Sequence, residues 1–199
     1  MGDSTRLRDS AMALAKATKH AAALEIARKV AEPWFRCQAL AGVARYAPDA
    51  SVVALAKEAV RAVERSDDPY EFVGAMAWVL RALLERGRGD EARRQLAAAI
   101  GLAPKIANST SRADALFLVV QAVWPEPELR ARAARSLVAG AGIGQSKKAG
   151  AVLRQVALML ATAGDDASYV VAAIADEKYR RTAERRLLER EVAEPRPFF

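Results

Sequence analysis

One pattern recurs five times along this chain of 199 residues, at a spacing of about 31–40 residues. Each copy places apolar residues three and four positions apart, which is the spacing of one face of an α-helix. The clearest copies are Pro33-x-x-Arg36-x-x-Ala39-Leu40-x-x-Val43-Ala44 and Pro69-x-x-Phe72-x-x-Ala75-Met76-x-x-Val79-Leu80, and weaker ones begin at Arg112, Val152 and Arg180. A repeat of this length with helical spacing indicates stacked two-helix units, each completing the core of its neighbour.

The composition favours helices over strands. Apolar residues make up 52% of the chain and aromatic residues only 6%, so the core is built mostly from Ala, Leu and Val. Ala and Leu are strong helix formers, and the β-branched and aromatic runs typical of strands are missing. We therefore predict an all-α fold, a right-handed superhelix of about five antiparallel hairpins. Residues 1–194 form one domain and residues 195–199 a C-terminal tail.

Local signals place the helix boundaries. Asp68-Pro69 is a strong start signal, with an N-cap residue followed by proline at the first helical position. Ser111 and Ser146 are the expected N-caps of two later helices. The expected long helices cover residues 5–18, 20–31, 33–46, 51–64, 69–86, 90–106, 111–124, 126–138, 146–163 and 176–192, with a short helix before residue 175.

The repeated helix pairs resemble α-solenoid repeats of the HEAT and tetratricopeptide type. The resemblance rests on proline at the start of the second helix and on Ala-Leu-x-x-Val-Ala within it, as in Ala39-Leu40 and Val43-Ala44. The Trp, Leu-Gly and Tyr signature of tetratricopeptide repeats is not present. The resemblance implies a scaffold that binds a partner, and it brings no catalytic residue with it.

The repeat register also predicts a binding surface. In such folds the second helices of the units usually line the concave side, and residues beside the core positions then face a common groove. The register places five residues along it: Arg45, Trp78, Arg81, Gln121 and Arg154. An aromatic residue flanked by arginines is a plausible hot spot for binding. The alternative is that Trp78 is an ordinary core residue, and we expect Trp34 and Trp124 to pack between units.

A second candidate site follows a glycine-rich stretch. Gly140, Gly142 and Gly144 precede Ser146-Lys147-Lys148, but the order of residues matches neither a Walker loop nor a dinucleotide fingerprint. Free N–H groups at a helix N-terminus together with two ammonium groups would suit an anion. We therefore name Ser146, Lys147 and Lys148 as an anion-site hypothesis, against the simpler interpretation of a flexible turn between helices.

Other chemistry finds little support in the sequence. Cys37 is the single cysteine, so it forms no internal disulfide, and His20 is the single histidine, without a recognisable catalytic partner. We expect no catalytic residue, no metal and no cofactor. No run of 18 apolar residues suggests a membrane span, so we expect a cytoplasmic protein that does not enter the membrane.

Two classes of partner remain for the groove. The net charge is +7, and residues 105–154 carry 8 Lys or Arg against 3 Asp or Glu, a net of +5. This basic section and the excess of arginine would suit nucleic acid, as in HEAT-like DNA glycosylases that hold DNA in a basic groove. Interleaved acidic residues favour a protein or peptide instead. We predict a non-catalytic scaffold that binds a protein or peptide, with nucleic-acid binding as the alternative.

Overall fold

The computed structural model describes residues 2–141, 145–196 and 198–199, and every regular element within these ranges is helical. This confirms the predicted all-α class. The α-helices in these ranges are α1 (Gly2–Lys16), α2 (His20–Lys29), α3 (Pro33–Tyr46), α4 (Val52–Val63), α5 (Pro69–Glu85), α6 (Gly89–Leu102), α7 (Ser109–Ala122), α8 (Pro127–Ala141), α9 (Lys147–Thr162), α10 (Ser168–Ala172) and α11 (Glu177–Leu188).

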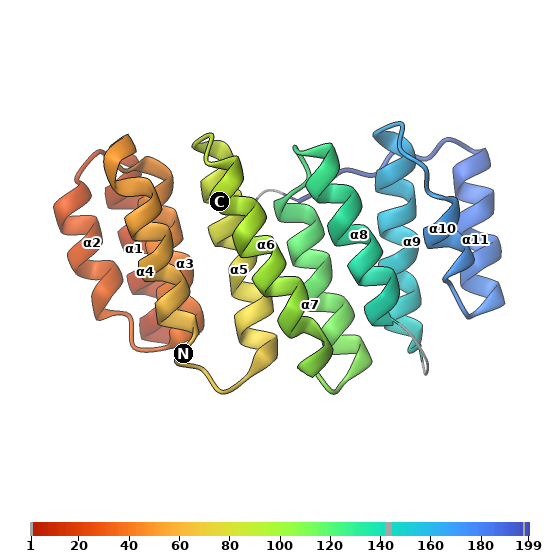
Figure 1. The fold of residues 1–199 in the computed structure, drawn as a ribbon, viewed down its shortest axis with the longest axis horizontal. Coiled ribbons are helices and arrows are strands. Elements are labelled where there is room, and N and C mark those ends of the chain that lie inside the picture. Colours follow the sequence, from red (N-terminus) through yellow and green to blue (C-terminus); the bar gives the residue numbers. More distant parts are fainter. Residues whose placement is uncertain (1, 142–144, 197) are drawn as a thin grey trace.

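The helices form two layers that run the length of the molecule. The odd-numbered helices pack side by side in chain order, so that α3 lies between α1 and α5, and α9 lies between α7 and α11. Each even-numbered helix packs on the odd-numbered helix that precedes it. Figure 1 shows the result as an elongated row of helices, with the even-numbered layer in front. This arrangement is compatible with a helical-repeat fold.

Side-chain caps explain where several helices begin. The Asp68 carboxylate accepts a hydrogen bond from the N–H of Tyr70 (2.8 Å), and the Ser146 hydroxyl accepts one from the N–H of Ala149 (3.1 Å). Both caps were predicted from the sequence. The prediction for α7 was wrong, because Asn108 is its cap and accepts from the N–H of Ser111 (2.9 Å). Asn is as good a cap as Ser, and it lies three residues earlier in the chain.

Two helices end four residues before the predicted position, and α8 continues to Ala141, three residues beyond it. The sixth helix was expected to reach residue 106, but α6 ends at Leu102 and a 3-10 turn covers Ala103–Lys105, since Pro104 cannot continue the hydrogen-bond ladder. The last helix was expected to reach residue 192, but α11 ends at Leu188. Arg190 adopts a left-handed conformation (φ 55°), and the N–H of Glu191 closes the helix end on the carbonyl of Arg186.

The end of α11 decides the path of everything that follows it. Residues 189–196 and 198–199, called the tail below, run back along the molecule instead of extending the last helix. Figure 1 shows this segment passing behind α9 and α7 towards α5, on the side of the odd-numbered helices. No helix in the described ranges combines the length and the hydrophobicity needed to cross a membrane.

Candidate partner-binding groove

The tail crosses four odd-numbered helices in reverse chain order. The N–H of Ala193 donates to the hydroxyl of Thr162 at the end of α9 (3.0 Å), and the N–H of Arg196 donates to the side-chain carbonyl of Gln121 on α7 (3.1 Å). The Phe198 ring then packs edge-on against Trp78 of α5. The tail therefore lies extended along one face of the odd-numbered layer, with contacts on successive helices.

Three of the five groove residues predicted from the repeat register contact this tail. Gln121 accepts its backbone hydrogen bond although only 4% of the residue is exposed. Trp78 is half-buried, and its ring centroid lies 5.2 Å from that of Phe198 at an interplanar angle of 75°. The Arg45 guanidinium lies over the Phe199 ring, 4.7 Å from its centroid. Arg45, Trp78 and Gln121, which the repeat register predicted to share a face, therefore all contact the same segment.

Arg81 belongs to the same face but contacts α3 through a shared carboxylate. Glu85 bonds to Arg45 and also forms an ion pair with Arg81 (3.1 Å), so one acid bridges two arginines on neighbouring helices. The Arg81 side chain is 17% exposed, and its Nη1 is buried without a hydrogen-bond partner. This triad ties α3 to α5 beneath the end of the tail.

Arg154 lies further along the row, away from the other four. Its guanidinium lies over the ring of Tyr179 of α11, 5.5 Å from the centroid. The structure therefore assigns Arg154 a packing contact between α9 and α11.

A chain of aromatic rings supports the Trp78 end of the groove. Trp34 stacks on Tyr70 (6.0 Å, 4°) and meets Trp78 edge-on (5.8 Å, 69°), so the rings run from α3 across α5 to Phe198. Trp34 thus packs between neighbouring units, as the sequence predicted. It also lies close over Gly74, where an added Cβ would come within 2.6 Å of the ring. A larger residue there would have to displace the ring, because the ring occupies the space of a side chain.

Trp124, the other predicted anchor, lies near the start of α8. The guanidinium of Arg130 lies over its ring, 4.8 Å from the centroid, and also donates to the Trp124 carbonyl (2.7 Å). Arg130 in turn forms an ion pair with Asp165 in the turn after α9 (2.7 Å). Trp124 therefore contributes to packing between units through an arginine.

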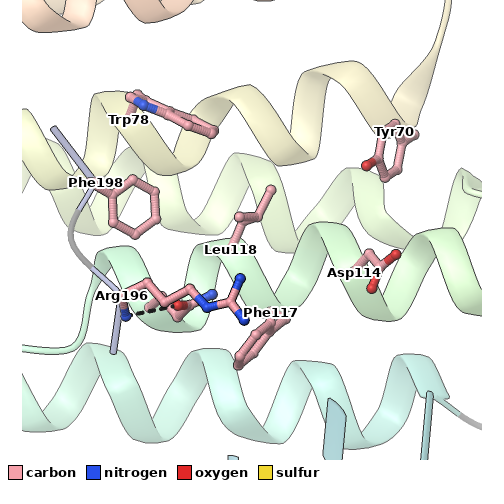
Figure 2. Close-up of a pocket in the computed structure, with 8 residues that line it drawn as sticks. Tyr70, Trp78, Asp114, Phe117, Leu118, Arg196 and Phe198 are labelled. Atoms are coloured by element: carbon pink, nitrogen blue, oxygen red, sulfur yellow. Dashed lines mark hydrogen bonds between the residues drawn. The ribbon is translucent and has the colours of Figure 1, made fainter. Parts of the chain in front are cut away.

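Two cavities flank the tail where it crosses α7. One of about 330 Å³ is lined by Tyr70, Trp78, Asp114, Phe117, Leu118, Gln121, Arg196 and Phe198. Figure 2 shows Trp78 and Phe198 at one end of it and Tyr70 with Asp114 at the other, and its dashed line marks the Arg196 bond to Gln121. The other, of about 270 Å³, lies towards α9 and shares Phe117, Gln121 and Arg196 with the first. The tail therefore occupies only part of a longer groove.

The charged groups of this face are of mixed sign. Lys148 on α9 forms an ion pair with Asp114 on α7 (2.6 Å), which raises the pKa of the lysine. Burial raises the pKa of the Tyr70 phenol, and the charge of Asp114 raises it further. Together with the Arg45, Glu85 and Arg81 triad, these pairs leave no continuous basic strip among the described groove residues.

The same contacts bear on the anion-site hypothesis. Lys148 already has Asp114 as its partner, while the Ser146 hydroxyl caps α9 and bonds to the hydroxyl of Thr110 (2.6 Å). Lys147 is exposed to solvent. Residues 142–144 of the glycine-rich stretch lie outside the described residues. Anion binding at Ser146, Lys147 and Lys148 stays a prediction, and it would require Lys148 to exchange a carboxylate for the anion.

Reactive side chains are scarce in the described part of the chain. Cys37 is fully buried, and burial raises the pKa of its thiol, which favours packing over nucleophilic chemistry. Within residues 2–141, 145–196 and 198–199, no group of three or more His, Cys, Asp or Glu side chains could hold a metal ion.

The sequence analysis missed most of the groove wall and its occupant. On α7 the wall is formed by Asp114, Phe117, Leu118 and Gln121, which follow one another at i, i+3, i+4 and i+7. This helical spacing identifies the whole strip once Gln121 is placed. The signal for the tail was Phe198-Phe199, an aromatic pair in a segment with too many prolines to form a helix.

Comparisons with protein-family models, with curated proteins and with solved structures found no match to this chain.

Proposed function

We propose that this protein is a helical-repeat scaffold that binds an extended peptide segment of a partner protein along its odd-numbered helices. The proposal includes the predicted superhelix of HEAT-like or tetratricopeptide-like hairpins, with this face as its concave side. One observation carries it: an extended segment of the chain itself already lies in the groove, bonded through its backbone and its aromatic rings.

The depth and chemistry of the groove support a peptide ligand. Gln121 is a buried amide that offers its carbonyl to a backbone N–H, which is how a protein surface holds a peptide of almost any sequence. Trp78 offers a half-buried ring for an apolar side chain. A buried polar anchor beside an aromatic surface is typical of the centre of a peptide-binding site.

Charge favours a peptide over nucleic acid. Phosphate backbones bind surfaces on which lysine and arginine are free to pair with them. Here Arg45 and Arg81 share Glu85, and Lys148 pairs with Asp114. A nucleic acid would have to break these pairs and would bring its own charge close to two carboxylates.

Selection from a library of random 12-residue peptides tests the proposal. It is run on the chain and on a full-length variant in which Phe198→Ala and Phe199→Ala weaken the hold of the tail. We expect enriched peptides whose affinity falls about fivefold to tenfold with Gln121→Leu, because one hydrogen bond to a buried acceptor is lost. The matched control is Gln95→Leu on α6, in the other layer, which leaves affinity unchanged.

Two outcomes would contradict the proposal. One is a selection that enriches no peptide dependent on Gln121 in either protein. The other is tight, salt-sensitive binding of a mixed-sequence DNA duplex in a fluorescence-anisotropy titration at two salt concentrations, which would favour the nucleic-acid alternative.

A further inference from the structure

The contacts of the tail are of two kinds, and the first kind is independent of sequence. The N–H groups of Ala193 and Arg196 donate to Thr162 and Gln121. Any residue except proline could donate in the same way. These two bonds, three residues apart, hold the segment in an extended path but do not select which segment is bound.

The second kind of contact depends on the side chains of the bound segment and so selects which segment binds. The Phe198 ring meets Trp78 edge-on, and the Phe199 ring lies beneath the Arg45 guanidinium. An edge-to-face aromatic pair and an arginine over a ring each add attraction beyond that of the apolar area they bury. Both contacts require an aromatic side chain, and both are made by adjacent residues of the tail.

Most of the described tail residues are exposed or half-buried, and Ala193 is the one buried residue among them. Glu194 and Arg196 are exposed, and the two cavities lie against this part of the segment. A segment with few buried apolar contacts opens at low free-energy cost compared with global unfolding. The tail can therefore leave the groove while the helical layers stay folded.

Resting on the proposed peptide-binding function, we propose that the tail occupies the place of the natural ligand, an extended partner segment with two adjacent aromatic residues. The aromatic residues follow two and three positions after the residue whose N–H bonds to Gln121, the spacing that Arg196, Phe198 and Phe199 show. The partner binds by displacing the tail. Because the tail is part of the same chain, it competes at an effective concentration that is high for a short tether.

The experiment uses a fluorescent synthetic peptide with the sequence of residues 191–199 and three full-length proteins. These are the unaltered chain, the double variant Phe198→Ala with Phe199→Ala, and the control Val192→Ala, where the side chain is 68% exposed. We expect the peptide to bind the double variant at least about tenfold more tightly than it binds the other two, since only the double variant has lost the competitor. Circular dichroism confirms that all three are folded.

Two further measurements fix the site and the chemistry. A control peptide with both phenylalanines replaced by alanine is expected not to bind the double variant. Adding Gln121→Leu to the double variant is expected to lower its affinity for the tail peptide about fivefold to tenfold, as in the library test. Tryptophan emission provides a second readout, because loss of Phe198 exposes Trp78 and bound peptide covers it again.

The outcomes separate this inference from the proposed function. Equal affinity of the tail peptide for the chain and the double variant would overturn the inference, because the tail would then not compete. If library peptides bind through Gln121 but the tail peptide does not bind, the groove binds peptides of other chemistry, and only the inference fails. If neither the library peptides nor the tail peptide binds, both the proposed function and the inference fail.

One more result would also overturn it. Light scattering could detect a concentration-dependent dimer of the unaltered chain that the double variant does not form. The tail would then belong in the groove of a second copy, and its place would be a contact between copies.

Discussion

Helices α5 and α6 are neighbours in the chain, yet they are buried in different ways. On α5 five consecutive residues are buried, from Val73 to Ala77, so the helix is enclosed on nearly every side. On α6 the buried residues form one stripe: Glu91, Ala92, Leu96 and Ala99. The cause is position, because α5 packs against α3, α4, α6 and α7, whereas α6 packs mainly on α5.

This difference bears on where the proposed binding face lies. A helix that buries only one stripe leaves a broad, polar surface facing solvent. The inner odd-numbered helices, α3, α5, α7 and α9, keep only a narrow strip free of neighbours, and on α5 it contains Trp78, Arg81 and Glu85 at helical spacing. The tail crosses this layer at Trp78. The residues of the proposed binding face are therefore few, close together and bordered by core.

Replacing one alanine by aspartate on each of the two helices tests the comparison most severely. Ala77→Asp on α5 places a carboxylate at a fully buried position without a partner, and we expect a loss of at least about 4 kcal/mol in the free energy of unfolding, or failure to fold. Ala97→Asp on α6, at an exposed position, should cost below about 1 kcal/mol, the difference in helix propensity. Urea unfolding followed by circular dichroism measures both, and similar losses would refute the two modes of burial.

Replacing one glycine by alanine on each of the two helices should change the free energy of unfolding in opposite directions. Gly74→Ala on α5 forces a methyl group to within 2.6 Å of the Trp34 ring, and we expect a net destabilisation of about 1–2 kcal/mol. Gly101→Ala on α6 meets nothing within 4 Å, so the gain in helix propensity should stabilise the chain by up to about 1 kcal/mol. Thermal unfolding of both variants checks this, and a stabilised Gly74 variant would show that Trp34 moves freely.

The even-numbered layer should contribute a pH-dependent term. Burial alone would raise the pKa of Glu91, but hydrogen bonds from Arg94 and Gln95 outweigh it, and the pKa lies below its usual value. A carboxyl with a lowered pKa in the folded state stabilises it above the unfolded pKa, and this is lost as the pH falls through the folded value. Glu91→Gln should therefore cost about 1 kcal/mol at pH 7 and reduce the loss of stability on acidification below about pH 4.5.

The measurement is the urea midpoint of the chain and of Glu91→Gln at several values between pH 7 and pH 3. The two curves should converge towards acid. Parallel curves would mean that the Glu91 carboxyl titrates alike in the folded and unfolded states. Glu128→Gln on α8, an exposed acid, serves as the control.

The smallest effect is expected at the last helix. α11 packs on α9 and α10 and has no later helix beside it, so its Arg185 and Glu189 pair is exposed (2.8 Å; side chains 61% and 53% exposed). Glu189→Gln should change the free energy of unfolding by less than about 0.5 kcal/mol. A larger change, measured in the same urea titration, would indicate that the row of odd-numbered helices depends on its charged end more than burial suggests.

Much of this architecture could be predicted from local signals. Pro33 and Pro69 mark the starts of α3 and α5, and the apolar spacing after them predicts buried helices. The repeat register placed Arg45, Trp78 and Gln121 on one face because equivalent positions in stacked units point the same way. It could not distinguish Arg154, whose guanidinium lies over Tyr179 of α11, since that contact joins residues 25 positions apart and no local pattern predicts it.

What the sequence by itself determined is the set of helices, their caps and the apolar faces that make them stack, because these depend on residues within a few positions of one another. Only the tertiary structure decided that the segment after α11 turns back and lies over Gln121 and Trp78. Its contacts join residues up to 154 positions apart, Arg45 and Phe199. No local pattern encodes such a pairing, because the groove exists only after four helices from separate units have packed into one layer.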